Sequence, residues 1–144
     1  MTPLHARPTP FKRPTLLIVG CGDIGMRVAA LLRGRWRLLA LTSDANRVAA
    51  LRQAGIQPIV GNLDDPASLS RLAGLADALL HLAPPSASGI RDIRTRNLLG
   101  ALSRRSRLRR IVYASTSGVY GDCGGATVDE TRPVDPRSER AQRR

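Results

Sequence analysis

Short apolar runs alternate with amphipathic stretches along most of this chain. A continuous apolar run bounded by turn residues is typical of a strand that is covered on both faces of a parallel sheet. The runs predict five strands, over residues 15–19, 37–41, 56–60, 78–82 and 110–114.

The stretches between these runs predict helices. The first helix should bury one face, made up of Ile24, Val28, Leu31 and Leu32. Asp44 is expected to cap a second helix over residues 47–54, and Asp65 a short helix over 67–72. A longer helix is expected over 89–105. The alternation predicts a doubly wound α/β fold, with about five parallel strands, right-handed crossovers and helices on both faces.

The glycine pattern G-x-G-x-x-G joins the first predicted strand to the first predicted helix. Gly20 would permit a tight turn, Gly22 would leave space for a diphosphate, and Gly25 would let the helix pack closely on the strand. Asp23 and Ile24 then open the helix, where free amides and the helix dipole favour phosphate. This context predicts a Rossmann domain that binds an NAD-family dinucleotide.

The end of the second strand should distinguish NAD from NADP. NAD-binding domains often place an acidic residue there to hold the ribose 2′-hydroxyl. This sequence has Thr42 and Ser43 instead, and Asp44 follows slightly late. Arg47, or less directly Arg37, could reach a 2′-phosphate, so NADP is favoured over NAD. The alternative for Arg47 is a solvated helix residue.

Charge and cysteine content narrow the partners. The net charge of +12 raises nucleic acid as a partner, but no aromatic residues interleave with the densest basic cluster, residues 104–110. A solvated basic surface is therefore expected rather than nucleic-acid binding. Cys21 and Cys123 lack metal-ligand spacing, which predicts free thiols, no metal and a reducing cytoplasm. No run approaches the ~18 apolar residues of a membrane span.

Four segments carry a resemblance to a known family. They cover residues 20–25, 61–66 (GNLDDP), 81–85 (HLAPP) and 111–122 (IVYASTSGVYGD). In these segments the chain resembles the extended short-chain dehydrogenase/reductase family, in its NAD-dependent epimerase/dehydratase group. The resemblance extends over roughly residues 15–140, and the last segment is its most specific part.

The resemblance implies roles for individual residues. Asn62 and Leu63 would lie by the adenine of the dinucleotide. Thr116 matches the catalytic Ser/Thr position, where a hydroxyl can hydrogen-bond a substrate carbonyl or alcohol. Ser115 and Ser117 are its nearest rivals, and a loop residue that bonds only local backbone is the alternative. The pocket beside the ribose and nicotinamide would be lined by Leu82, Ala83 and Pro84.

The family's Tyr-x-x-x-Lys dyad is not present. When the end of the chain is laid on that pattern, Arg140 takes the tyrosine position and Arg144 the lysine position. An arginine keeps its proton at any working pH, so it cannot relay a proton as a phenol does. The chain therefore resembles an atypical branch, in which tyrosine-mediated dehydrogenation, epimerisation or dehydration is not expected.

These observations predict three regions. Residues 1–14 are interpreted as a disordered leader, 15–122 as the NAD(P)-binding Rossmann domain, and 123–144 as a loop and the start of a helix leading to an absent carboxyl-terminal half. The expected function is that of an NAD(P)-dependent oxidoreductase or epimerase/dehydratase acting on a small carbonyl or nucleotide-sugar-like substrate. The alternative is a catalytically inactive NAD(P)-binding sensor or scaffold. An uncovered edge of the shortened sheet would favour a homo-oligomer.

Overall fold

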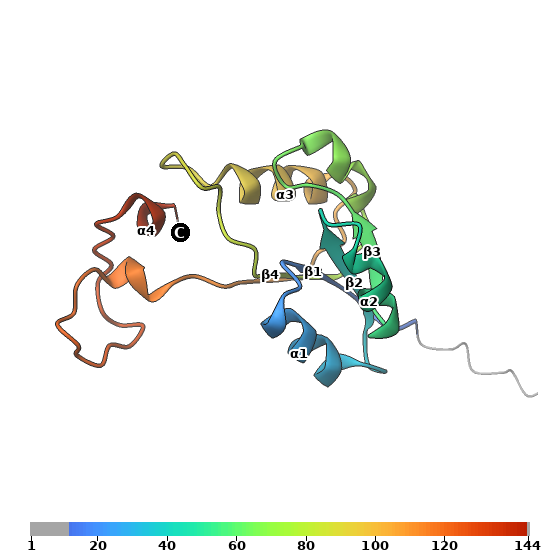
Figure 1. The fold of residues 1–144 in the computed structure, drawn as a ribbon, viewed down its shortest axis with the longest axis horizontal. Helices are drawn as coiled ribbons and strands as arrows, with labels where there is room; N and C mark the ends of the chain where they lie inside the picture. Colours follow the sequence, from blue (N-terminus) through green and yellow to red (C-terminus); the bar gives the residue numbers. More distant parts are fainter. Residues whose placement is uncertain (1–11, 144) are drawn as a thin grey trace, which may run out of the picture.

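A single parallel sheet with helices on both faces forms the protein in a computed structural model that describes residues 12–143 (Figure 1). The sheet order is β3-β2-β1-β4-β5, and every neighbouring pair is parallel. The predicted doubly wound α/β fold is therefore confirmed. The strands are β1 (Thr15–Val19), β2 (Arg37–Thr42), β3 (Gln57–Val60), β4 (Ala78–His81) and β5 (Arg110–Tyr113).

The helices follow the predicted order with corrected ends. They are α1 (Asp23–Leu32), α2 (Arg47–Gln53), the 3-10 helix η1 (Pro66–Leu72), α3 (Ile93–Ser103), the 3-10 helix η2 (Ser117–Tyr120) and α4 (Glu139–Gln142). The helix expected over 89–105 begins only at Ile93, because Asp92 caps it by accepting a hydrogen bond from the Thr95 amide at 2.9 Å. Most of the predicted leader lies outside the described residues.

One predicted cap is confirmed and one is wrong. Asp65 accepts a hydrogen bond from the Ala67 amide at 3.1 Å and caps η1, as expected. Asp44 does not cap α2, whose first flanking residue is Asn46. The Asp44 carboxylate instead accepts a hydrogen bond from the Asn46 amide at 2.9 Å and closes a turn ahead of the helix.

Alternating side chains of the strands divide the core into two layers. Leu17 and Leu39 point toward η1 and α3, whereas Ile18 and Ala40 point toward α1 and α2. Figure 1 shows α1 and α3 on opposite sides of the sheet. Complete burial of an aliphatic side chain such as Leu17 stabilises the fold by about 1.5–3 kcal/mol.

Helix α1 buries only part of the face that its sequence predicts. Ile24 and Leu31 are 64% and 77% exposed, while Gly25 and Ala29 are buried. The small residues Gly25 and Ala29 allow the helix to approach the sheet closely. This close packing determines the orientation of the helix and leaves larger apolar residues exposed. The predicted buried face of α1 is therefore wrong at Ile24 and Leu31, whereas Leu32 packs against the core as predicted.

Strand β5 forms an apolar edge of the sheet. Ile111 and Val112 are 51% and 52% exposed, so the last strand is covered less than β1 or β2. No helix in the part of the chain that the structure describes is long and apolar enough to cross a membrane.

Candidate functional site

A cleft of about 260 Å³ opens where the carboxyl ends of the central strands meet. The connections that follow β1 and β4 leave to opposite faces of the sheet, and such a switch point is where parallel α/β sheets place ligands. The cleft is lined by Val19, Gly20, Cys21, Leu41, Thr42, Ser43, Asp44, Arg47, Gly61, Asn62, Leu63, Ala83, Pro84 and Arg94.

The three glycines of the first turn have three different environments. Gly20 has a φ of +83°, and a Cβ there would lie 2.4 Å from the Ala83 nitrogen. A Cβ on Gly22 would have no atom within 4 Å, whereas one on Gly25 would lie 3.2 Å from the Ile18 side chain. A tight turn, an open backbone and close helix packing are the geometries expected of a dinucleotide-binding loop.

Helix α1 begins without a side-chain cap. Gly22 is its first flanking residue and supplies no capping oxygen, so the amides of the first turn lack the partner that a cap provides. The Asp23 carboxylate is paired with Arg27 at 3.0 Å, which offsets its negative charge at this end of the helix. The start of α1 therefore retains amide donors and a positive dipole for an anion.

Arg47 reaches across the cleft to the glycine turn. Its Nη2 donates a hydrogen bond to the Cys21 carbonyl at 2.7 Å, which ties α2 to the loop after β1. Burial raises the pKa of the Cys21 thiol, and the nearby Arg47 charge only partly opposes this effect. Thr42 is buried beneath, where its hydroxyl accepts a hydrogen bond from the Asp44 amide at 3.2 Å.

The segment after β3 is fastened to α3. Arg94 donates two hydrogen bonds to the Asp64 carboxylate, at 2.8 and 2.6 Å, and this guanidinium holds the pKa of Asp64 below its usual value. Asn97 donates to the Leu63 carbonyl at 2.9 Å. The Asn62 side-chain oxygen accepts from the Asp64 amide at 3.0 Å. These bonds fix the loop that forms one wall of the cleft.

Most predicted ligand contacts gather at this cleft, but some do not line it. Leu82 was expected to line the cleft. Its side chain instead packs against the core on the α1 side and does not line the cleft. Asp23 and Ile24 lie at the start of α1 with exposed side chains, and like Gly22 and Gly25 they do not line the cleft. Thr42, Arg47, Asn62, Leu63, Ala83 and Pro84 all line the cleft.

The candidate catalytic residues lie on the segment after β5. Thr116 flanks η2, and its hydroxyl accepts a hydrogen bond from the Gly118 amide at 3.4 Å. Ser115 is exposed. Neither residue lines the cleft described above, so the structure does not bring them onto the glycine turn.

A buried polar network beside the cleft was not predicted from the sequence. His81 lies at the end of β4, 2.7 Å from the Thr95 hydroxyl, which donates to Asp92 at 2.6 Å. Because this hydroxyl has one hydrogen, the His81 Nε2 is the donor to Thr95. Tyr113 donates to Asp92 at 3.4 Å and packs edge-on against the His81 ring. The network fixes the start of α3 to the ends of β4 and β5.

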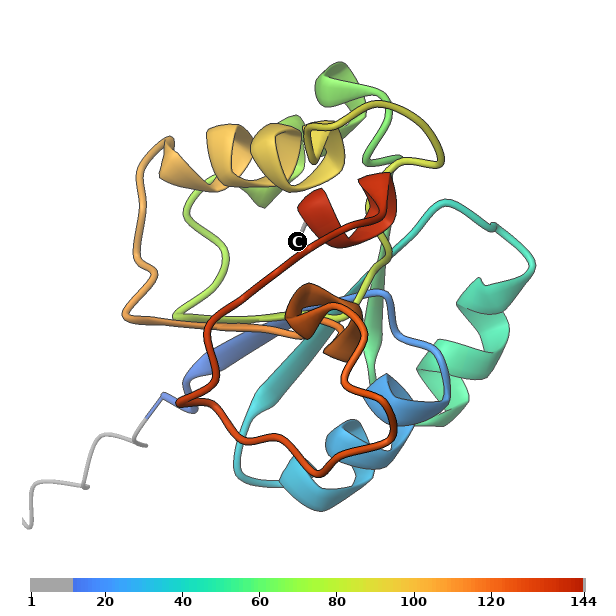
Figure 2. The same cartoon turned by 90° about the vertical axis from the view of Figure 1, so that its left-hand side faces the viewer.

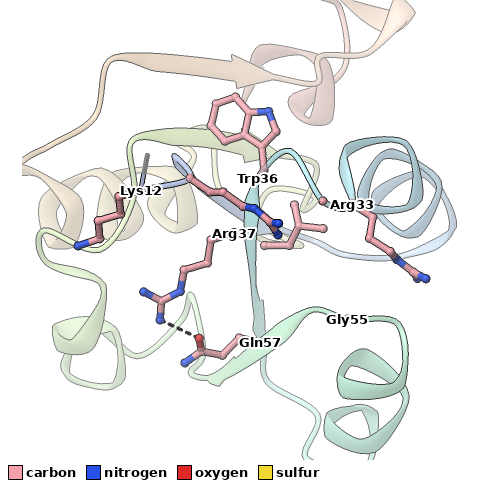
Figure 3. A pocket seen from close by; sticks show the side chains of 9 residues that line it. Lys12, Arg33, Trp36, Arg37, Gly55 and Gln57 are labelled. Atoms are coloured by element: carbon pink, nitrogen blue, oxygen red, sulfur yellow. Dashed lines mark hydrogen bonds between the residues drawn. The ribbon is translucent and has the colours of Figure 1, made fainter. Parts of the chain in front are cut away.

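Basic residues gather at the opposite, amino-terminal edge of the sheet. Figure 3 shows Lys12, Arg33 and Trp36 around a hollow of about 550 Å³, with Arg37 turned toward Gln57. Arg37 donates to the Gln57 side chain at 2.9 Å, so it cannot reach a ribose at the cleft and that expectation is wrong. Trp36 also lines an adjoining hollow with Arg107, Arg109 and Arg110, so an aromatic side chain does accompany the basic cluster in space.

A comparison with family models decides the classification of this fold. Residues 16–117 match the model of the TrkA-N domain. The chain belongs to the TrkA-N domain family. This TrkA-N domain also shares its fold with solved structures of NAD-dependent epimerases/dehydratases and of short-chain dehydrogenase/reductase proteins, which confirms the resemblance noted in the sequence.

Individual relatives match this TrkA-N domain over part of their length. Protein YeeZ of Escherichia coli K12 is 33% identical over 128 residues, which are 83% of this chain and 46% of YeeZ. A 4-hydroxy-2-methyl-3-oxo-4-farnesyl-3,4-dihydroquinoline-1-oxide ketoreductase of Stigmatella aurantiaca is 28% identical over 132 residues, which are 85% of this chain and 40% of the ketoreductase. The chain therefore spans less than half the length of the curated relatives that it matches.

A solved structure with a bound ligand is also similar to this TrkA-N domain. It is a short-chain dehydrogenase/reductase superfamily protein from Agrobacterium tumefaciens with bound NAD. The two chains share 25% identity with a TM-score of 0.67, over 88% of this chain and 40% of the other.

Proposed function

We propose that this TrkA-N domain binds an NAD-family dinucleotide in the cleft and is the cofactor-binding part of an oxidoreductase or epimerase-like protein. The observation that carries the proposal is the uncapped start of α1 beside Gly22, where a Cβ would meet no atom within 4 Å. Amide donors, a positive helix end and open space at a switch point together suit a diphosphate.

The residues around the cleft divide into groups according to the part of the dinucleotide that each would hold. The backbone of Gly20, Gly22, Asp23, Ile24 and Gly25 would hold the diphosphate. Thr42 and Arg47 would lie by the adenosine ribose, and Asn62 and Leu63 by the adenine. The strand end at Leu82, Ala83 and Pro84 would lie beside the second ribose and the nicotinamide.

A bound nicotinamide would accept or supply a hydride for a small carbonyl or nucleotide-sugar-like substrate. The similarity to a ketoreductase supports a carbonyl as the reacting group. The Thr116 hydroxyl would donate a hydrogen bond to the substrate oxygen and hold it in place, with Ser115 as the second candidate. Arg140 would remain charged and act by position and charge, because it cannot pass on a proton.

Replacing Gly22 by leucine tests the cofactor site. Gly22 has a φ of −80°, and its surroundings are open, so the change should leave the fold intact while its side chain enters the diphosphate space. NADPH and NADH fluorescence titrations should show affinity at least about tenfold weaker, which is a loss of about 1.4 kcal/mol. Gly100→Leu, at another open position, is the control and should bind as the unaltered chain does. Equal binding by Gly22→Leu would refute the proposed site.

Replacing Arg47 by leucine tests the preference for NADP. A charged hydrogen bond to a 2′-phosphate contributes about 1.5–3 kcal/mol. The affinity for NADPH should therefore fall by roughly tenfold or more, while the affinity for NADH changes little. Arg52→Leu on the same helix is the matched control, because Arg52 does not line the cleft. If the affinities for both cofactors fall equally, Arg47 only supports the glycine turn and does not contact a 2′-phosphate.

A dinucleotide-binding module without chemistry is the second candidate function. The arginine at the tyrosine position favours it, since no phenol stands there to relay a proton. Turnover of a carbonyl substrate that is lost in Thr116→Ala would support the enzyme. Tight NADPH binding without hydride exchange against a broad carbonyl panel would support the module.

A further inference from the structure

A second hollow of about 360 Å³ adjoins the cleft and is lined by three arginines. Its walls are the proline-rich segment 84–87, Arg94 from α3, and Arg140 and Arg143 from the end of the chain. It shares Pro84 and Arg94 with the cleft. Figure 1 shows α4 on the side of the 84–92 segment away from the body of α3, and Figure 2 shows α4, drawn in red, from that side, so the hollow is formed between this segment and the end of the chain.

Arg143 is a buried guanidinium held by carbonyl oxygens. Its side chain is 6% exposed, and it donates to the carbonyls of Gly89 and Ala87. Its Nε has no hydrogen-bond partner within residues 12–143. The Glu139 carboxylate lies 3.6 Å from the Arg143 Nη1 and is mostly exposed. A buried charge with an unused donor is costly unless an anion accompanies it.

Arg94 is held at the other end of the same segment. Two of its donors go to Asp64, and Nη1 donates to the Pro84 carbonyl at 3.4 Å. An arginine has five N–H donors, so Arg94 retains donors after these bonds. Arg140 is exposed and makes no hydrogen bond or ion pair with any residue that the structure describes. All three cations line the hollow, and among residues 12–143 no carboxylate side chain does.

We propose that this arginine-lined hollow binds the anionic group, a carboxylate or a phosphate, of a substrate that reacts beside the adjoining cleft. The planar arginine fork matches both anions. The hollow contains no residue of the glycine turn, so it is separate from the proposed diphosphate site. The assignment to a substrate rests on the proposed cofactor function. Arg140, at the tyrosine position, is then an anion-binding residue in place of a proton relay.

Binding of malonate and of inorganic phosphate to the full chain tests the hollow. Isothermal titration at fixed ionic strength should detect one of the two anions, and this identifies carboxylate or phosphate as the preferred group. Arg140→Gln should lower the affinity for that anion by about tenfold, because one charged hydrogen-bonding partner is removed. Arg137→Gln is the control, since Arg137 is exposed, pairs with Asp135 at 2.8 Å and lies outside the hollow.

The outcomes separate this inference from the cofactor proposal. Loss in Arg140→Gln but not in Arg137→Gln, with NADH affinity unchanged, supports the hollow as a substrate subsite. Equal losses in both variants, or no binding of either anion, overturn the inference even if NADH binds. Anion binding in a chain that binds neither NADH nor NADPH overturns the substrate assignment and the cofactor proposal together. Arg140→Ala gives a second variant if Arg140→Gln does not fold.

Discussion

Replacement of Gly20 by alanine is expected to destabilise the protein through a backbone collision under the cleft. Gly20 has a φ of +83°, and a Cβ would lie 2.4 Å from the Ala83 nitrogen and 2.8 Å from the Leu82 carbonyl carbon. The left-handed backbone alone costs a non-glycine residue about 1–2 kcal/mol. Overpacking against backbone atoms, which cannot rotate away, adds about 1–3 kcal/mol.

A glycine elsewhere in the chain separates these two contributions. Gly34 has a φ of +81°, nearly that of Gly20, but a Cβ there would meet no atom within 4 Å. Gly34→Ala should therefore lose only the conformational part, while Gly20→Ala loses about 2–5 kcal/mol of a total stability that is about 5–15 kcal/mol for most proteins.

Urea unfolding followed by circular dichroism measures both variants. Gly20→Ala should show the lower midpoint, with a difference of about 1–3 kcal/mol in the free energy of unfolding between the two variants. If both variants lose the same stability, the close approach of the glycine turn to the segment after β4 does not exist in solution. The proposed cofactor cleft depends on this close approach, so that result would also contradict the geometry of the cleft.

Two further predictions concern pH and association. The Thr15 amide, and to a smaller extent Arg107, hold the pKa of Asp77 below its ordinary value of 3.8. The ionised Asp77 carboxylate therefore stabilises the fold above pH 3.8, and this stabilisation is lost as the pH falls through the lower pKa of the folded state. The difference in melting temperature between the unaltered chain and Asp77→Asn should therefore shrink between pH 5 and about pH 2, and a constant difference would contradict this reasoning. The exposed apolar side chains of Ile111 and Val112 on β5 should promote self-association, which Val112→Lys should reduce in sedimentation velocity. A concentration-independent monomer of the unaltered chain would contradict that expectation.

The local sequence was sufficient to predict the sheet and its helices. Runs such as Leu16–Val19 are apolar at every position because both faces of a parallel strand are covered, and no other common element has that pattern over so few residues. The glycine turn was equally clear, because its spacing reflects constraints that act within a few residues of chain. These parts depend on local sterics and on periodicity.

Orientation and long-range pairing depended on the tertiary structure. Which face of α1 is buried was decided by how closely Gly25 and Ala29 can approach the sheet, and the larger Ile24 remained exposed. The role of Asp44 in a turn, and the engagement of Arg37 with Gln57, could not be predicted from spacing because they depend on which neighbour reaches each side chain first.

The sequence by itself determined the fold class, the glycine turn and the order of elements, because these follow from the periodicity and backbone freedom of nearby residues. Only the tertiary structure brought Arg94, Arg140 and Arg143 to one hollow and joined His81 to Thr95. Such groups come from segments far apart in the chain. Their meeting is fixed by the packing of whole helices on the sheet, and no local pattern records it.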